Sequence, residues 1–213
     1  DMLDNYDKSF EYNELTYKLA TEIQDKENMA KSLNNIGYLY AKIDEYDKAM
    51  DFLKRSLKIE EEHGERFHIA NSIRFIGKLY FDMNNYTESL NYYKRFLKIK
   101  EEIGDKNGIA LATTLLGHYY SLIGNYDQAL VELKRSLKLY KQIEVTIHLK
   151  RRYLDIGWVY YSIGEYQKAL EYYNYALDLA NKLNNMSSLS NIFVNIGLVH
   201  FQQQDYKQAL ENI

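Results

Sequence analysis

The side chains that could do chemistry in this chain are histidines, carboxylates and basic residues, because the sequence contains no cysteine. Of the five histidines, at positions 63, 68, 118, 148 and 200, only His63 and His68 are close in sequence, and they flank a predicted turn without an obvious third ligand. A zinc site needs three or four ligands, so we predict no metal site. The acidic run Glu60, Glu61 and Glu62 lies at the predicted end of a helix, which favours a solvated terminus over a cation site.

The sequence also lacks the patterns with which enzymes assemble an active site. It contains no Gly-rich phosphate loop, no His-Glu-x-x-His motif and no nucleophile elbow. The lack of cysteine excludes thiolate nucleophiles and Cys-based zinc sites. We therefore predict no enzymatic activity and no cofactor, and we expect a binding function instead.

Charge and hydropathy narrow the class of partner. The 213 residues carry a formal net charge of −3, which gives no reason to expect nucleic acid, although a basic line recurs at Lys54-Arg55, Lys94-Arg95 and Lys134-Arg135. No apolar run approaches the roughly 18 residues needed to span a bilayer. The acidic, polar N-terminus lacks the features of a secretory signal, so we expect a cytoplasmic protein without a membrane partner.

The elements that position these side chains repeat with a period of 40 residues. Glycine recurs at Gly37, Gly77, Gly117, Gly157 and Gly197, and tyrosine recurs at Tyr6, Tyr46, Tyr86, Tyr126, Tyr166 and Tyr206. A small residue follows each of these tyrosines by three positions, and an aromatic residue or, at the last repeat, His200 follows each glycine by three. Regular self-similarity at this spacing is the signature of a repeat architecture.

Each unit is predicted to form two helices, over 29–43 and 46–62 in the first unit, because apolar residues recur there at intervals of three and four. Asn85 with Glu88, and Asn125 with Gln128, fit a cap that starts the second helix. The glycine inside each first helix costs about 1 kcal/mol relative to alanine, so its recurrence predicts that a neighbouring side chain lies over that backbone.

These residues resemble the tetratricopeptide repeat family, whose pattern is W-x2-L-G-x2-Y, then A-x3-F, then A and P. One unit matches as Tyr153, Ile156, Gly157, Tyr160, Ala169, Tyr173 and Ala176. The resemblance implies an all-α fold, a right-handed superhelical solenoid of helix pairs formed by one array over 1–213. Its parts are a second helix at 4–22, full repeats at 26–65, 66–105, 106–145 and 146–185, and a truncated repeat at 186–213.

Two departures from the pattern refine the resemblance. The closing proline is missing, since the sequence has no proline, and the period is 40 rather than 34. This longer form is similar to the repeats of the Pins/LGN adaptors, of kinesin light chain, and of bacterial peptide-sensing regulators and sensor kinases.

The resemblance also implies a concave groove lined by the first helices, in which a peptide or a helix of a partner binds. Counted from each repeat glycine, the expected groove residues are Lys31, Asn34, Tyr38, Asn71, Arg74, Lys78, Thr114, His118, Arg151, Leu154, Trp158 and Asn191, with Leu111, Val194 and Leu198 beside them. Arg74 and Lys78 suit an acidic ligand group, and Trp158 suits an apolar anchor. The alternative is that these residues are only the solvated side of each helix. The cation-and-amide clamp of chaperone-binding members is absent, because its positions hold Asn34, Tyr38, Phe75, Leu111 and Leu115.

We therefore predict a protein-interaction module without chemistry of its own. The alternatives are a peptide-sensing regulatory domain of a larger bacterial regulator, or the sensor part of a kinase or cyclase. Both ends of the array leave apolar positions such as Leu210 uncovered, so we also expect end-to-end self-association at high concentration.

Overall fold

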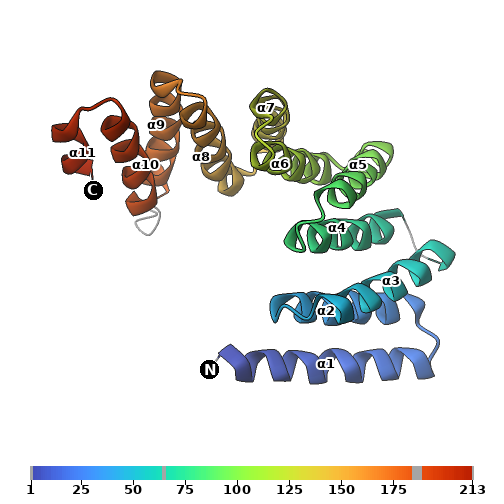
Figure 1. The fold of residues 1–213 in the computed structure, drawn as a ribbon. Coiled ribbons are helices and arrows are strands. Elements are labelled where there is room, and N and C mark those ends of the chain that lie inside the picture. The colour runs from blue at the N-terminus through green and yellow to red at the C-terminus, as the bar shows by residue number, and fades with distance from the viewer. Residues whose placement is uncertain (1, 64–65, 184–188, 213) are drawn as a thin grey trace. The chain divides into compact units, whose positions relative to one another are not determined.

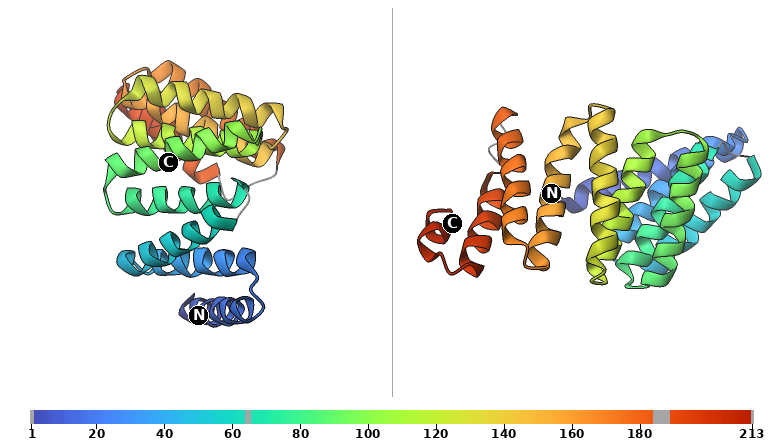
Figure 2. Two further views of the ribbon diagram at one scale, coloured as in Figure 1. Left: turned by 90° about the vertical axis from the view of Figure 1, so that its right-hand side faces the viewer. Right: turned by 90° about the horizontal axis from the view of Figure 1, so that it is seen from above.

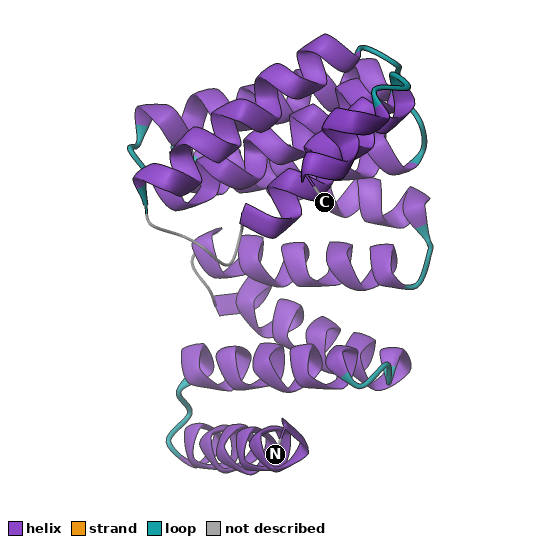
Figure 3. Cartoon of the chain, turned by 90° about the vertical axis from the view of Figure 1, so that its left-hand side faces the viewer, coloured by secondary structure: helices purple, strands orange, loops and turns teal. Residues whose placement is uncertain are grey.

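The computed structural model describes residues 2–63, 66–183 and 189–212, and it divides into two compact units, Asp1–Asp105 and Lys106–Ile213. The regular structure of the described residues is entirely α-helical, and short loops join the helices (Figures 1 and 3). The first unit holds α1 (Met2–Glu22), α2 (Lys26–Lys42), α3 (Tyr46–His63), α4 (Arg66–Asp82) and α5 (Tyr86–Glu102). The second holds α6 (Lys106–Leu122), α7 (Tyr126–Gln142), α8 (Thr146–Ser162), α9 (Tyr166–Lys182), α10 (Leu189–Gln202) and α11 (Tyr206–Asn212).

Consecutive helices pack as pairs within each unit. In the first unit α2 packs on α3 and α4 on α5, with α1 against α2. In the second unit α6 packs on α7, α8 on α9 and α10 on α11, and α7 to α10 lie as successive neighbours in the view from above (Figure 2). The predicted all-α architecture of helix pairs is confirmed. None of the described helices is long and apolar enough to cross a bilayer.

The turn inside each pair is built the same way in both units. The backbone N–H at the residue before each recurrent tyrosine donates to the carbonyl of the aromatic residue three positions after the repeat glycine, as in Asn85 to Tyr80 at 2.8 Å and Glu165 to Tyr160 at 2.9 Å. This bond closes the end of the first helix, as in a Schellman motif. Asn85 and Asn125 then accept a hydrogen bond from the backbone three residues on, so the predicted caps are confirmed.

The residue that enters this turn has a left-handed backbone. Gly124 and Gly164 have φ of +74° and +79°, whereas Asp44 and Asn84 hold φ of +60° and +59° at the corresponding positions. The turn between repeats also contains a residue with a left-handed backbone, Gly104 at φ +70° or Glu144 at φ +56°. A residue with a Cβ is strained in this conformation, because its Cβ approaches the following carbonyl oxygen.

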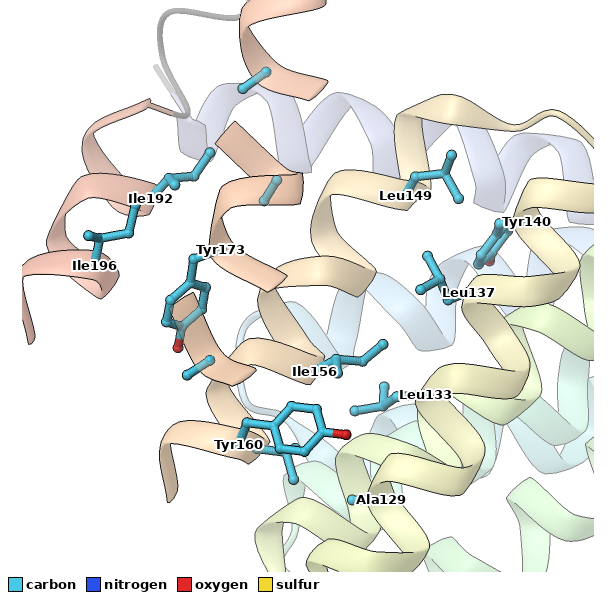
Figure 4. Packing of buried hydrophobic residues seen from close by; sticks show 14 of the residues in the cluster. Ala129, Leu133, Leu137, Tyr140, Leu149, Ile156, Tyr160, Tyr173, Ile192 and Ile196 are labelled. Carbon is cyan, nitrogen blue, oxygen red and sulfur yellow. The ribbon is translucent and has the colours of Figure 1, made fainter. Parts of the chain in front are cut away.

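The glycine inside each first helix makes room for a side chain of its partner helix. A Cβ on Gly37 or Gly117 would lie 2.8 Å or 2.6 Å from the Cγ of Leu53 or Leu133. A Cβ on Gly157 would lie 2.5 Å from the ring of Tyr173. The prediction that a neighbouring side chain covers these glycines is therefore confirmed. Figure 4 shows Tyr173 among the buried residues of the second unit, together with Ile156, Leu133 and Ile192.

Candidate ligand-binding surface

The first helices of the first unit, α2 and α4, present five of the predicted groove residues at least partly to solvent. Lys31 and Tyr38 are exposed, and Asn71, Arg74 and Lys78 are partly buried. Lys31 forms an ion pair with Glu27 one turn earlier on the same helix. Lys78 Nζ lies 2.5 Å from Asp82 Oδ2, so its charge is also compensated within α4.

Two predicted groove residues are buried instead. Asn34 is 6% exposed, and its Nδ2 donates to Ser72 Oγ at 2.7 Å and to Glu60 Oε1 at 3.3 Å. Thr114 is 5% exposed and donates to the carbonyl of Ala110 at 2.9 Å. Both side chains satisfy their hydrogen-bonding groups inside the unit, so we remove them from the ligand surface. The sequence does not show that these polar residues are buried, because their hydrogen-bond partners lie elsewhere in the fold.

A pocket of about 380 Å³ opens between α2, the start of α3 and α4. Six of its ten lining residues are aromatic or aliphatic and the other four are charged, and the predicted residues Tyr38 and Lys78 both line it. The rings of Tyr38 and Phe75 are 5.9 Å apart across the two repeats. The charged groups around this pocket are Lys42, Asp44, Lys78 and Asp82. A pocket with apolar walls and polar groups around it suits one side chain of a bound segment.

Tyr46, the recurrent tyrosine of this repeat, also lines the pocket, and its hydroxyl donates to Asp44 Oδ1 at 2.8 Å. This hydrogen bond raises the pKa of Tyr46, because the neutral hydroxyl is the form that donates. Tyr86 donates to Asn84 in the same way at 2.7 Å. The pairing holds each tyrosine ring at the junction of its turn.

Arg74 lies one helical turn before Lys78 on the same face of α4. Its guanidinium is 4.2 Å from the centre of the Phe75 ring, a cation–π contact. Partial burial lowers the pKa of Arg74. The guanidinium is nevertheless charged at neutral pH, because an arginine begins from a pKa above 12.

In the second unit the predicted residues have a different chemistry. Trp158 is 46% exposed and makes an edge contact with Tyr126, with ring centres 6.4 Å apart. On α8 and α10, Arg151 and Asn191 are exposed and Leu154 is partly buried. Of the three residues expected beside the groove, Val194 and Leu198 on α10 are exposed, whereas Leu111 on α6 is partly buried. This part of the surface is therefore mainly apolar.

His118 is held by a neighbouring repeat. Its Nε2 is 3.0 Å from Asp155 Oδ2, and the same oxygen accepts from Arg152 at 2.7 Å. Arg152 is 5% exposed and its Nε has no hydrogen-bond partner among the described residues. Asp155 therefore neutralises a buried guanidinium and links α6 to α8. His118 already has a protein partner.

The predicted position of Glu60 was wrong. It was predicted to lie in a solvated helix terminus, but it is 3% exposed, whereas Glu61 and Glu62 are exposed. Burial raises the pKa of Glu60 to about 7, with the Ser72 hydroxyl opposing the rise and the charge of Glu61 adding to it. Glu60 Oε2 has no partner among the described atoms.

The two histidines that are close in sequence, His63 and His68, are the residues to consider for a metal site. His63 ends α3, but its side chain lies outside the described part of the chain, and His68 Nε2 is 3.6 Å from Glu27 Oε1. Among the described side chains no group of three or more His, Asp or Glu residues is arranged to hold a metal ion.

Comparisons with known proteins agree on the fold. Sequence models of the tetratricopeptide repeat match residues 2–62 and 68–142, and a second such model matches 151–183. No curated protein sequence matches the chain.

Solved structures with this architecture share little sequence with the chain. BtubC from P. vanneervenii superposes with a TM-score of 0.87 at 16% identity, covering 98% of this chain and 88% of BtubC. A Rap protein complexed with Competence and Sporulation Factor gives 0.72 at 17% identity, covering 92% of this chain and 56% of that one. Repeats of a Podospora anserina putative kinesin light chain give 0.72 at 14% identity, covering 85% of this chain and 92% of that one. At these identities the likeness concerns the fold.

Proposed function

This chain belongs to the tetratricopeptide repeat family, and from that premise we propose that it is a protein-interaction module that binds a peptide or helix of a partner on its first helices. The observation that carries the proposal is the pocket between α2 and α4, which combines aromatic walls with charged groups around it. Repeat arrays hold extended segments by anchoring single side chains in such sites.

The second unit supplies an apolar part of the same kind of surface. Trp158, Leu154, Val194 and Leu198 lie on the first helices α8 and α10, at the register positions that Tyr38, Arg74 and Lys78 occupy in the first unit. An exposed tryptophan is a frequent energetic anchor of protein interfaces. We expect an aromatic anchor on each unit, Tyr38 in the first and Trp158 in the second.

The test is selection from a random-peptide display library on the immobilised chain. Selected peptides are then measured by fluorescence polarisation against the unchanged chain, Tyr38→Ala and Trp158→Ala. Removal of an aromatic anchor should weaken binding about 30-fold or more. Val131→Ala is the control, because Val131 is 57% exposed on the second helix α7 and lies outside the proposed surface.

Two results would overturn the proposal. In one, no peptide is enriched over the immobilisation matrix. In the other, Val131→Ala weakens binding as much as the two aromatic substitutions, which would place the ligand on the second helices instead.

A peptide-sensing regulatory domain of a larger regulator or sensor kinase is the second candidate, and it would use the same surface. The observation in its favour is the structural likeness to a Rap protein that was solved with Competence and Sporulation Factor. Small-angle scattering with and without a selected peptide separates the two. A sensor should change its dimensions on binding, whereas a simple interaction module should keep them.

Self-association is a further part of the proposal. Leu15 and Leu19 of α1 and Ile23, the residue after it, are 50–74% exposed, and Leu210 of α11 is 80% exposed. Exposed apolar faces of this kind favour association, because association removes their apolar surface from water. Sedimentation at increasing concentration should show dimers, and a monomer at all concentrations would contradict the expectation.

A further inference from the structure

We propose that Arg74 receives a carboxylate of the bound partner, and that the adjacent pocket takes an apolar, ring-sized side chain next to that carboxylate. The inference rests on the proposed function, because it names the chemistry of the ligand that this surface would bind. Three observations support it: which arginines have an anionic partner, what Arg74 contacts, and the size and lining of the pocket.

Arg74 differs from the other described arginines in having no anionic partner while being partly buried. Arg66 and Arg95 pair with glutamates, Arg55 with an aspartate, and the buried Arg152 with Asp155. Arg135 is exposed, and so is Arg151, which has no ion pair among the described residues, so water solvates both of these side chains. A partly desolvated guanidinium without an anion is unfavourable, and a bound carboxylate would remove that penalty.

The surroundings of Arg74 orient it for such a contact. The guanidinium carbon lies 4.2 Å from the centre of the Phe75 ring, and this contact uses no hydrogen-bond acceptor, so the N–H donors stay available to a ligand. Phe75 and Tyr38 are wall residues of the pocket. Arg74 itself does not line the pocket, but it contacts a ring that does, and for this reason we place the carboxylate next to the group that fills the pocket.

The lysines beside the pocket are less suited to the carboxylate. Lys78 is already paired with Asp82 at 2.5 Å, and Lys42 lies 5.2 Å from the centre of the Tyr38 ring. The nearby Asp44 would also repel an anion placed deep in the pocket. A volume of about 380 Å³ with Tyr38, Leu53 and Phe75 in its walls instead suits a phenyl or large aliphatic group.

The experiment uses two small probes of one shape, 3-phenylpropanoate and its neutral amide, 3-phenylpropanamide. Each is titrated into the isotopically labelled chain at pH 7, and the backbone N–H signals of Phe75 and Lys78 are followed by NMR. We expect the carboxylate to bind about tenfold or more tightly than the amide, because a charge-assisted hydrogen bond is the difference between them.

Substitutions assign the preference to Arg74. Arg74→Gln should bind the two probes with equal affinity, and Arg74→Lys should retain part of the preference because it keeps the charge without the planar fork. Arg151→Gln is the matched control, since it removes an unpaired arginine from the second unit and should leave the preference unchanged.

Several outcomes would overturn the inference. They are equal affinity of the two probes for the unchanged chain, no shift of the Phe75 and Lys78 signals by either probe, or a preference that survives in Arg74→Gln. The comparison of the two probes on the unchanged chain decides the matter even if Arg74→Gln does not fold. If peptide selection succeeds but these probes are not distinguished, the proposed function stands and this inference fails.

Discussion

The buried carboxyl group of Glu60 should make the stability of the first unit fall as pH rises from about 4 to 8. In the folded chain its pKa is raised to about 7, whereas 4.5 is the value for an exposed glutamate. Between these two values the folded state binds more protons than the unfolded state, so the free energy of unfolding decreases with increasing pH. The stabilisation is fully present below pH 4.5 and is lost as pH rises through 7. The difference corresponds to about 3 kcal/mol as an upper limit.

The variant that tests this reasoning is Glu60→Gln, which keeps the shape and the acceptor for Asn34 but cannot ionise. At pH 5 the variant and the unchanged chain should have similar stability, apart from a constant offset. At pH 8 the variant should be more stable relative to that offset, by an amount approaching 3 kcal/mol. Urea unfolding followed by circular dichroism gives the overall values, and amide hydrogen exchange in α3 and α4 locates the effect.

Glu45→Gln is the control, because Glu45 is 52% exposed in its ion pair with Lys48 and should change stability by less than about 1 kcal/mol at either pH. The reasoning is refuted if Glu60→Gln and the unchanged chain have parallel stability profiles between pH 5 and 8. It is also refuted if the carboxyl carbon of Glu60 titrates near 4.5 by NMR.

Three further predictions follow from packing and backbone geometry, each measured by urea unfolding. Gly157→Ala should destabilise the chain by about 1–3 kcal/mol despite its better helix propensity, because the new Cβ would meet the Tyr173 ring at 2.5 Å; a gain in stability would contradict this. Glu144→Gly should stabilise by about 0.5–1 kcal/mol, because φ of +56° strains a residue with a Cβ, and a loss would show that the Glu144 side chain contributes more than the strain. Asp155→Asn should cost about 2–3 kcal/mol by leaving the buried Arg152 without an anion, and an unchanged midpoint would show that Arg152 needs no such partner.

The repeat pattern predicted the parts of the fold that depend on local chemistry. The position of Gly157 under a neighbouring side chain and the caps at Asn85 and Asn125 were predicted because each follows from the residue type and its spacing. The start of α2 was predicted three residues late, at 29 rather than Lys26, because the Asp25 cap was not recognised. Caps of this kind are visible in the sequence once the turn before the helix is located.

The burial of polar groups could not be predicted in the same way. Asn34 occupies the register position that Arg74 occupies in the next repeat, yet Asn34 is buried and Arg74 is partly exposed. The difference arises from Ser72 and Glu60, which offer hydrogen bonds to Asn34 from α4 and α3. Glu60 likewise belongs to an acidic run, and its burial depends on the contacts of α2, α3 and α4 rather than on its neighbours in sequence. A period fixes which positions are equivalent, but the partners across the helices decide what each one does.

The side chains that cover the repeat glycines alternate along the chain: Leu53, Tyr93, Leu133 and Tyr173. The same residue type therefore recurs at intervals of 80 residues. Most positions are also identical between the segments 46–59 and 126–139, YDKAMDFLKRSLKI and YDQALVELKRSLKL. The boundary between the two compact units, after Asp105, also falls where one such block of two repeats ends. Neighbouring repeats therefore meet the same close approach of two helices with side chains of different shape, a branched aliphatic one and a flat ring, so the packing at one repeat glycine has its counterpart two repeats away rather than in the adjacent repeat.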